Sequence, residues 1–207
     1  IAFFILFALF SPRVQANAYE AELPAGLASA TDMCALLPCT EVFPGATHFS
    51  ERKGQPPYVE AYDKAGADKK LLGYVMLSTD ITDTPAYSGK PVVTLIGMDT
   101  KGIFVGVKVL KHSEPILLLG IPESALLNFN AQYLGKSVAD KIEVGQSRPD
   151  EEVLGLDAIS GATVTVIAQN QVMMASGSAV ARQVGILAPT VRDPARYVFT
   201  GRRGGWA

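Results

Sequence analysis

A threonine at the end of a short run of small residues is the feature of this sequence that most directly suggests chemistry. Residues 157–165 read DAISGATVT, in which Asp157 precedes Ser160-Gly161-Ala162-Thr163. Ser and Thr are common at helix starts, where their side-chain oxygens accept hydrogen bonds from free backbone N–H groups. Two interpretations follow: the run caps a helix, or the Thr163 hydroxyl is left accessible so that a large group can be attached to it.

The expected position of Thr163 favours an anionic group. Residues 164–184 predict a helix that Thr163 opens and Gly185 ends. The start of a helix offers unpaired backbone N–H groups and the positive end of the helix dipole, which together bind phosphate. Gly161 and Ala162 leave room beside the hydroxyl, and Ser160 could either cap the helix or bond a phosphate oxygen. A phosphate-bearing group attached at Thr163 would therefore be accommodated.

Hydrophobic periodicity predicts the elements that must position Thr163. Alternating or continuous apolar residues predict strands at 58–62, 71–79, 92–98 and 103–110, with residues 99–102 as the turn of a hairpin. Residues 122–134 begin with Pro-Glu-Ser and carry several apolar side chains, which predicts a helix. A meander of strands followed by helices is typical of the α+β class, with an antiparallel sheet packed against helices.

The same pattern predicts the domain organisation. Residues 58–188 form the expected domain. Residues 19–57 are rich in Ala, Pro and Gly, so we expect a loosely structured extension with a short helix near 25–37. Residues 189–207 contain four arginines and several glycines, and we interpret them as a linker or a truncated continuation of the chain.

Composition restricts the class of protein. The chain has 207 residues, 48% of them hydrophobic and 18% charged, which is enough for one globular domain with its own core. The formal net charge is −2 and no basic cluster occurs, which argues against nucleic acid as a partner because phosphate contacts need grouped Lys and Arg. With two His and two Cys, the chain alone cannot assemble a structural zinc site or a Cys-ligated iron–sulfur cluster, so we predict no metal site.

The first residues predict export. Residues 1–10 are all apolar and small residues follow, as in the h-region and cleavage site of a secretory signal peptide, with cleavage after Ala16 or Ala18. No initiator Met and no basic segment precede the apolar run. We therefore interpret residues 1–18 as a truncated signal peptide or the end of a membrane anchor, with a buried N-terminal helix or strand as the alternative.

The two cysteines agree with export. Cys34 and Cys39 are separated by four residues in a loop that contains Pro38. In an oxidising compartment such a pair is predicted to form a structural disulfide. Two free buried thiols and a redox-active pair are the alternatives.

Residues 157–163, called the threonine run below, resemble a motif of a known family. Asp157 to Thr163 resembles the D-x-x-S/T-G-A-T motif of exported FMN-binding domains. The resemblance implies that a flavin transferase joins FMN through its phosphate to Thr163. It also implies a cofactor site around this residue, for which the candidates are Asp157, Ser160, Gly161, Ala162 and Thr165.

A second stretch resembles the same domains. Residues 111–122 read KHSEPILLLGIP and are similar to an H-x-E-T-P-G-x-G loop, with Ile116 to Leu119 in place of its small residues. His112 and Glu114 are therefore further candidates for the cofactor site, and Leu117, Leu118 and Leu119 could cover one face of the flavin. As alternatives, His112 is an exposed or core-edge residue and Glu114 is a polar loop residue or backbone anchor.

The resemblance is most specific for the flavin domain of NosR-type proteins, the membrane-bound factors required for nitrous oxide reductase. It covers about residues 19–200 and includes the C-x4-C pair, FPGA at 43–46 and PYVEAY at 57–62. Subunits of the sodium-pumping NADH:quinone reductase and of the Rnf complex share the flavin motif. NosR-type proteins continue into transmembrane helices and iron–sulfur centres, which we do not expect residues 19–207 to provide.

This resemblance implies that the protein is a periplasmic electron-transfer domain, which carries covalent FMN and supports nitrous oxide reductase or its maturation proteins. Such a domain is a redox carrier rather than a stand-alone enzyme, and its further partner is the flavin transferase. The alternative is a flavin-dependent regulatory or sensory module that controls expression of the reductase system.

Overall fold

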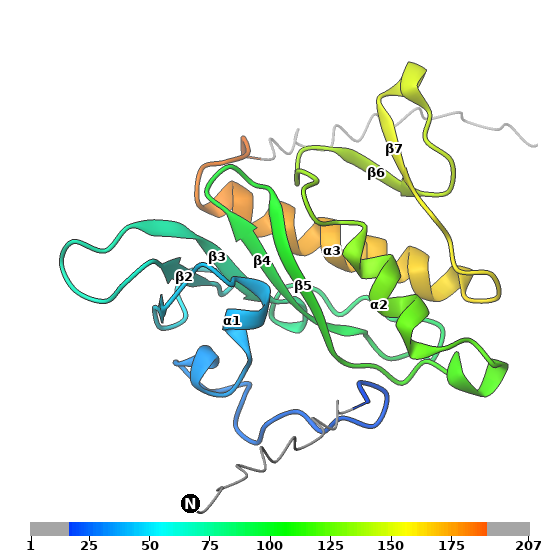
Figure 1. Ribbon diagram of the computed structural model, residues 1–207, viewed down its shortest axis with the longest axis horizontal. Coiled ribbons are helices and arrows are strands. Elements are labelled where there is room, and N and C mark those ends of the chain that lie inside the picture. The colour runs from blue at the N-terminus through cyan, green and yellow to red at the C-terminus, as the bar shows by residue number, and fades with distance from the viewer. Residues whose placement is uncertain (1–16, 190–207) are drawn as a thin grey trace, which may run out of the picture.

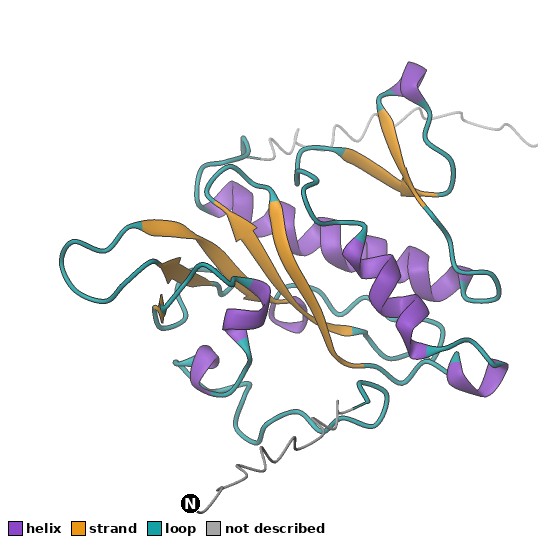
Figure 2. Cartoon of the chain, viewed as in Figure 1, coloured by secondary structure: helices purple, strands orange, loops and turns teal. Residues whose placement is uncertain are grey.

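Five antiparallel strands form the sheet that supports the threonine run. In a computed structural model, which describes residues 17–189, each strand pairs with the next one along the chain. The α+β class is therefore confirmed (Figures 1 and 2). The strands are β1 (His48–Phe49), β2 (Val59–Tyr62), β3 (Leu71–Leu77), β4 (Val93–Asp99) and β5 (Phe104–Lys111).

Both faces of the sheet are covered. Along β3, Tyr74 and Met76 belong to the core on one face, whereas Val75 and Leu77 belong to the core on the other. This follows from the two-residue period of a strand, which turns successive side chains to opposite faces. A strand buried on both faces reads as a continuous apolar run, which is why residues 71–79 lack a clear polar alternation.

Two helices cover the first face. They are α2 (Glu123–Ala131), which contacts β5, and α3 (Thr163–Gln183), which contacts β3 and β4. Phe129 of α2 and Met173 of α3 are buried in one cluster with Ile96 of β4. Both helices were predicted from the sequence, and α2 ends at Ala131, after which residues 132–135 form turns.

The N-terminal segment covers the second face, and the predictions of a loose extension and of a helix near 25–37 are wrong. The segment instead contains a turn at 25–29, the single 3-10 turn η1 (Met33–Ala35) and the short helix α1 (Cys39–Val42). Pro38 disfavours helical geometry at the residue before it, which separates η1 from α1. Leu27, Met33 and Phe43 are buried against the sheet. Burial of each such side chain is worth about 1.5–3 kcal/mol, enough to order a segment without helical periodicity.

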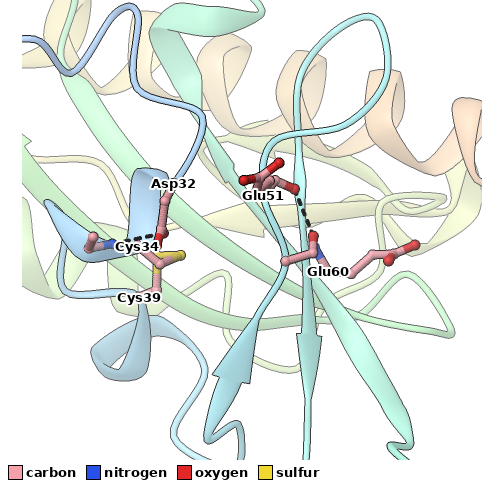
Figure 3. The surroundings of a disulfide bond; sticks show 7 residues. Asp32, Cys34, Cys39, Glu51 and Glu60 are labelled. Carbon is pink, nitrogen blue, oxygen red and sulfur yellow. Dashed lines mark hydrogen bonds between the residues drawn. A yellow bond between two sulfur atoms is a disulfide. The ribbon is translucent and has the colours of Figure 1, made fainter. Parts of the chain in front are cut away.

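A disulfide joins Cys34 of η1 to Cys39 of α1, the pairing favoured from the sequence (Figure 3). Beside it, the Asp32 carboxylate accepts a hydrogen bond of 3.0 Å from the Ala35 N–H and caps η1. The crosslink thus holds together the two short helical elements of the N-terminal segment.

The contact of α1 with the sheet depends on two glycines. Gly97 of β4 and Gly106 of β5 are cross-strand partners. A Cβ atom at Gly106 would lie 2.0 Å from the carbonyl oxygen of Val42, the last residue of α1, and a Cβ at Gly97 would lie 2.2 Å from the same oxygen. The absence of both side chains lets the backbone of α1 approach the strands directly.

A second, two-stranded sheet leads into the threonine run and was not predicted. It consists of β6 (Lys141–Val144) and β7 (Val153–Leu156), which are parallel. Ile142 and Leu156 are buried in the core with α3. Each strand has only four residues and few buried side chains, so its sequence has no readable period. The pairing matters because β7 ends immediately before Asp157.

Within residues 17–189 there is no helix of the length and hydrophobicity that membrane crossing requires. The predicted signal or anchor falls outside the described residues except for Asn17 and Ala18, and of the predicted tail only Pro189 is described.

Candidate functional site

The side chain of Gln132 holds the backbone at the start of the threonine run through two hydrogen bonds. Gln132, the C-cap of α2, accepts a hydrogen bond of 2.8 Å from the Asp157 N–H and donates one of 3.2 Å to the Asp157 carbonyl oxygen. The chain then turns, with the Ala162 N–H bonded to the Ile159 carbonyl at 3.0 Å. Gly161 has φ of +82°, a conformation that glycine adopts without strain. These two hydrogen bonds and the turn position Thr163 as the first residue of α3.

Thr163 is exposed at an uncapped helix start. The N-cap is Ala162, which has no side-chain hydrogen bond to offer, and the first turn of α3 holds no acidic residue. Ser160 is exposed and lies outside the cap position, so the alternative in which Ser160 caps the helix is wrong. The N–H groups and dipole of this 21-residue helix are therefore presented next to the Thr163 hydroxyl, as an anion requires.

Thr163 is one of the residues that line a cavity of about 250 Å³. This volume is slightly below the range of about 300–1,000 Å³ for small-molecule sites. Its walls come from three segments: the loop before β4, the segment after β5 and the start of α3. Tyr87 and Leu119 are 65% and 64% exposed, so large apolar surfaces are available at its mouth. The lining residues are Tyr87, Pro115, Ile116, Leu119, Gly161, Ala162, Thr163, Val164 and Thr165.

Glu114 lies behind this cavity and acts as an anchor. Its carboxylate is fully buried and accepts hydrogen bonds from the N–H groups of Tyr87 (3.1 Å) and Ser88 (2.9 Å). It also accepts one from the hydroxyl of Thr165. Thr165 is itself buried, so its hydroxyl is committed to Glu114. Of the two alternatives for Glu114, the structure therefore supports the backbone anchor.

His112 does not line the cavity. It is buried, and its Nδ1 accepts a hydrogen bond of 3.3 Å from the Glu114 N–H. Its Nε2 lies 3.9 Å from Oε1 of Glu123, an oxygen that also accepts a 2.6 Å bond from the Ala18 N–H. Its ring is 5.5 Å from the ring of Tyr19. His112 therefore fixes the start of the described chain instead of facing the exposed threonine.

The stability of the protein is expected to depend on pH through His112. Burial lowers the pKa of His112 below its ordinary 6.5, although Glu123 and Glu114 oppose this shift. The unfolded chain therefore binds the proton more readily than the folded one. The free energy of unfolding therefore keeps its full contribution from neutral His112 above pH 6.5. This contribution decreases as the pH falls below that value towards the folded-state pKa.

Urea unfolding between about pH 5 and pH 7 measures this dependence. The difference in unfolding free energy between the wild type and His112→Gln isolates the contribution of this imidazole from that of the carboxylates. We expect His112→Gln to flatten the curve in the upper part of the range. Equal slopes for the two proteins would contradict the assignment.

The structure also assigns positions that the sequence did not single out. Tyr87 and Ser88 lie between the strands predicted at 71–79 and 92–98, and Gln132 lies in the helix predicted at 122–134. Gln169 is fully buried and donates to Thr94 Oγ1 (3.0 Å) and Asn130 Oδ1 (2.7 Å), which ties α3 to both β4 and α2. One signal was readable: Gln169 follows Thr165 by four residues, which places both on one face of α3.

The fold and the site define a class of protein. Residues 87–175, from the Tyr87 loop into α3, match the family model of the FMN-binding domain. This range contains every residue that lines the cavity. The chain thus carries an FMN-binding domain over these residues, and FMN is the cofactor that this match indicates.

The relatives identify the type of FMN-binding domain. The chain is 42% identical over 118 residues to the regulatory protein NosR of Stutzerimonas stutzeri, and the aligned residues make up 57% of this chain and 16% of the relative. It is 37% identical over 147 residues to the regulatory protein NosR of Pseudomonas aeruginosa, an alignment that covers 71% of this chain and 20% of the relative. It is 30% identical over 98 residues to the protein NirI of Paracoccus denitrificans, with 47% of this chain and 13% of the relative covered.

The FMN-binding domain is therefore of the NosR type, which confirms the resemblance seen in the sequence. The chain spans a fifth or less of the length of these curated relatives.

Proposed function

We propose that this protein is an electron-transfer domain that holds FMN through a phosphoester to the Thr163 hydroxyl. One observation carries the proposal: Thr163 is exposed at the uncapped start of α3 and lines a largely apolar cavity. An ester at this oxygen places the phosphate next to the free N–H groups and the positive end of the helix dipole. The exposed positions of Asp157 and Ser160 leave the run open to the flavin transferase that would attach the group.

The residues present fit the flavin. The N–H groups of the first turn of α3 would hold the phosphate, and the apolar walls of the cavity would contact the isoalloxazine. Leu119 and Tyr87 supply the largest exposed surfaces there, whereas Leu117 packs against a core cluster. Bound FMN supplies reversible electron transfer, and the chain supplies attachment, orientation and partial shielding from water.

We place the domain in the periplasm, in support of nitrous oxide reductase or its maturation. The disulfide between Cys34 and Cys39 supports an oxidising compartment, because such crosslinks are rare where thiols are kept reduced. The similarity to NosR supports the connection with the reductase system. The domain then passes electrons between partners and does not transform a substrate of its own.

A second function is favoured by one observation, the description of both NosR relatives as regulatory proteins. In that function the oxidation state of the flavin would change contacts with a partner and so control expression. Flavin reduction and reoxidation at the turnover rate of the reductase would support the carrier. Full reductase activity in cells that carry a Thr163 variant would support the regulator.

Mass spectrometry tests the attachment. The chain is produced with and without a flavin transferase, and its intact mass and the mass of the peptide that contains Thr163 are measured. We expect the FMN increment only with the transferase and only on this peptide. An unmodified peptide after coexpression with an active transferase would contradict the proposed function.

A further inference from the structure

We propose that Glu114 is a positioning residue for the flavin, which holds the ring of Tyr87 at the cavity without touching the cofactor. The inference rests on the proposed function, because it assumes that FMN occupies the cavity beside Thr163. It concerns how the walls of that cavity are kept together. It also gives Tyr87 a role as the aromatic contact of the isoalloxazine.

All three walls of the cavity meet at this carboxylate. Oε1 accepts from the Ser88 N–H, and Oε2 accepts from the Tyr87 N–H and from the Thr165 hydroxyl. The first two donors belong to the loop before β4, and the third belongs to the start of α3. Glu114 itself directly precedes Pro115 and Ile116, which belong to the remaining wall together with Leu119.

The loop needs this partner. Within it, the Ala86 N–H bonds to the Lys90 carbonyl and the Gly89 N–H bonds to the Ala86 carbonyl, both at 3.0 Å. The two N–H groups between them, those of Tyr87 and Ser88, bond to Glu114. Without the carboxylate, both donors would lose their hydrogen-bond partner, which destabilises the folded loop wherever the N–H group stays buried. The loop would move to restore their hydrogen bonds, and the exposed Tyr87 ring would move with it.

Glu114 cannot contact the flavin itself. Its side chain is fully buried, and its two oxygens already accept three hydrogen bonds. Any effect of this residue on the cofactor must therefore pass through Tyr87, or through Thr165 and the helix that bears Thr163. This indirect route separates a positioning residue from a ligand and can be tested by combining substitutions.

The conservative variant is Glu114→Gln. It keeps the size of the side chain but replaces one acceptor oxygen by an NH2 group, which then faces a donor. Thr165→Val removes one of the three donors and leaves the carboxylate in place, and Thr165→Ser keeps the hydroxyl as its matched control. These two substitutions provide the test should Glu114→Gln fail to fold.

Flavin fluorescence reports on Tyr87, because a phenol ring in contact with an isoalloxazine quenches its emission. The proteins are coexpressed with a flavin transferase, and the FMN increment is verified by mass. We expect Tyr87→Leu to raise the emission several-fold and Glu114→Gln to raise it by a similar factor. The double variant should be no brighter than Tyr87→Leu alone, since residues that act through one another are not additive.

Hydrogen exchange provides a readout that does not need the flavin. In protein made without transferase, the amide of Tyr87 or Ser88 that faces the new NH2 group should exchange about tenfold faster in Glu114→Gln, as expected for the loss of one hydrogen bond. Thr165→Val should show a smaller increase in amide exchange and in flavin emission, and Thr165→Ser should match the wild type in both.

Two results would overturn the inference. One is a flavinylated Glu114→Gln protein with wild-type emission and wild-type amide protection. The other is an additive effect in the double variant. Absence of the FMN increment from the wild type itself would instead contradict the proposed function, and the inference would fall with it.

Discussion

A Thr163→Val protein is expected to fold like the wild type and to carry no covalent FMN after coexpression with a flavin transferase. The substitution keeps the shape of the side chain and removes the only oxygen through which the proposed ester could form. Because Thr163 is exposed, the free energy of unfolding should change by no more than about 0.5 kcal/mol. Intact mass measures the attachment, and urea unfolding measures the stability.

Thr163→Ser is the matched control. It retains a hydroxyl at the start of α3, so any attachment by the transferase is expected on this variant and not on Thr163→Val. An FMN increment on Thr163→Val, or on a peptide that lacks residue 163, would contradict the assignment. The buried Thr165 is the nearest other threonine, and its hydroxyl is bonded to Glu114.

A Gly106→Ala substitution is expected to be the most damaging small change on the sheet. The new Cβ would lie 2.0 Å from the Val42 carbonyl oxygen and 2.4 Å from the Val42 Cα, and both are backbone atoms. Backbone cannot rotate away as a side chain can, so α1 must shift off β4 and β5. We expect a loss of unfolding free energy of about 3 kcal/mol, the upper end of ordinary overpacking effects. Thermal unfolding should then occur about 6–12 °C lower.

Gly45→Ala is the control for this prediction. Gly45 lies in the same N-terminal segment, and a Cβ there would meet only the Leu72 Cδ1 at 3.9 Å, an ordinary contact. This control should unfold close to the wild type. Gly97→Ala should be destabilised like Gly106→Ala, since its Cβ would meet the same Val42 oxygen at 2.2 Å. A Gly106→Ala protein as stable as the control would show that α1 does not depend on this approach.

The major strands and the two long helices could be predicted because their signals are local. Apolar residues at a period of two, or in a continuous buried run, indicate β2 to β5, and Gly185 and the small residues of the threonine run mark the ends of α3. Thr163 could be located for the same reason, since a motif and a helix start are both contiguous in sequence. The short strands β6 and β7 could not be predicted, because four residues with few buried side chains carry no readable period.

The N-terminal segment shows a different limit. Its apolar side chains have no regular spacing, so its composition suggested a loose extension. Its order comes from burial against the second face of the sheet and from the two glycines that admit α1. Neither cause is visible until the strands are placed beside one another.

The amino-acid sequence by itself determined the α+β class, the position of Thr163 at the start of a helix and the type of FMN-binding domain. Only the tertiary structure decided which other side chains accompany that threonine. Glu114 and Thr165 are 51 residues apart, yet they share a hydrogen bond, whereas His112, two residues from Glu114, faces Tyr19 and Glu123 instead. The physical reason is that periodicity records which face of an element is buried. The partner across a buried contact depends on the order and register of the strands and on the paths of the loops between them.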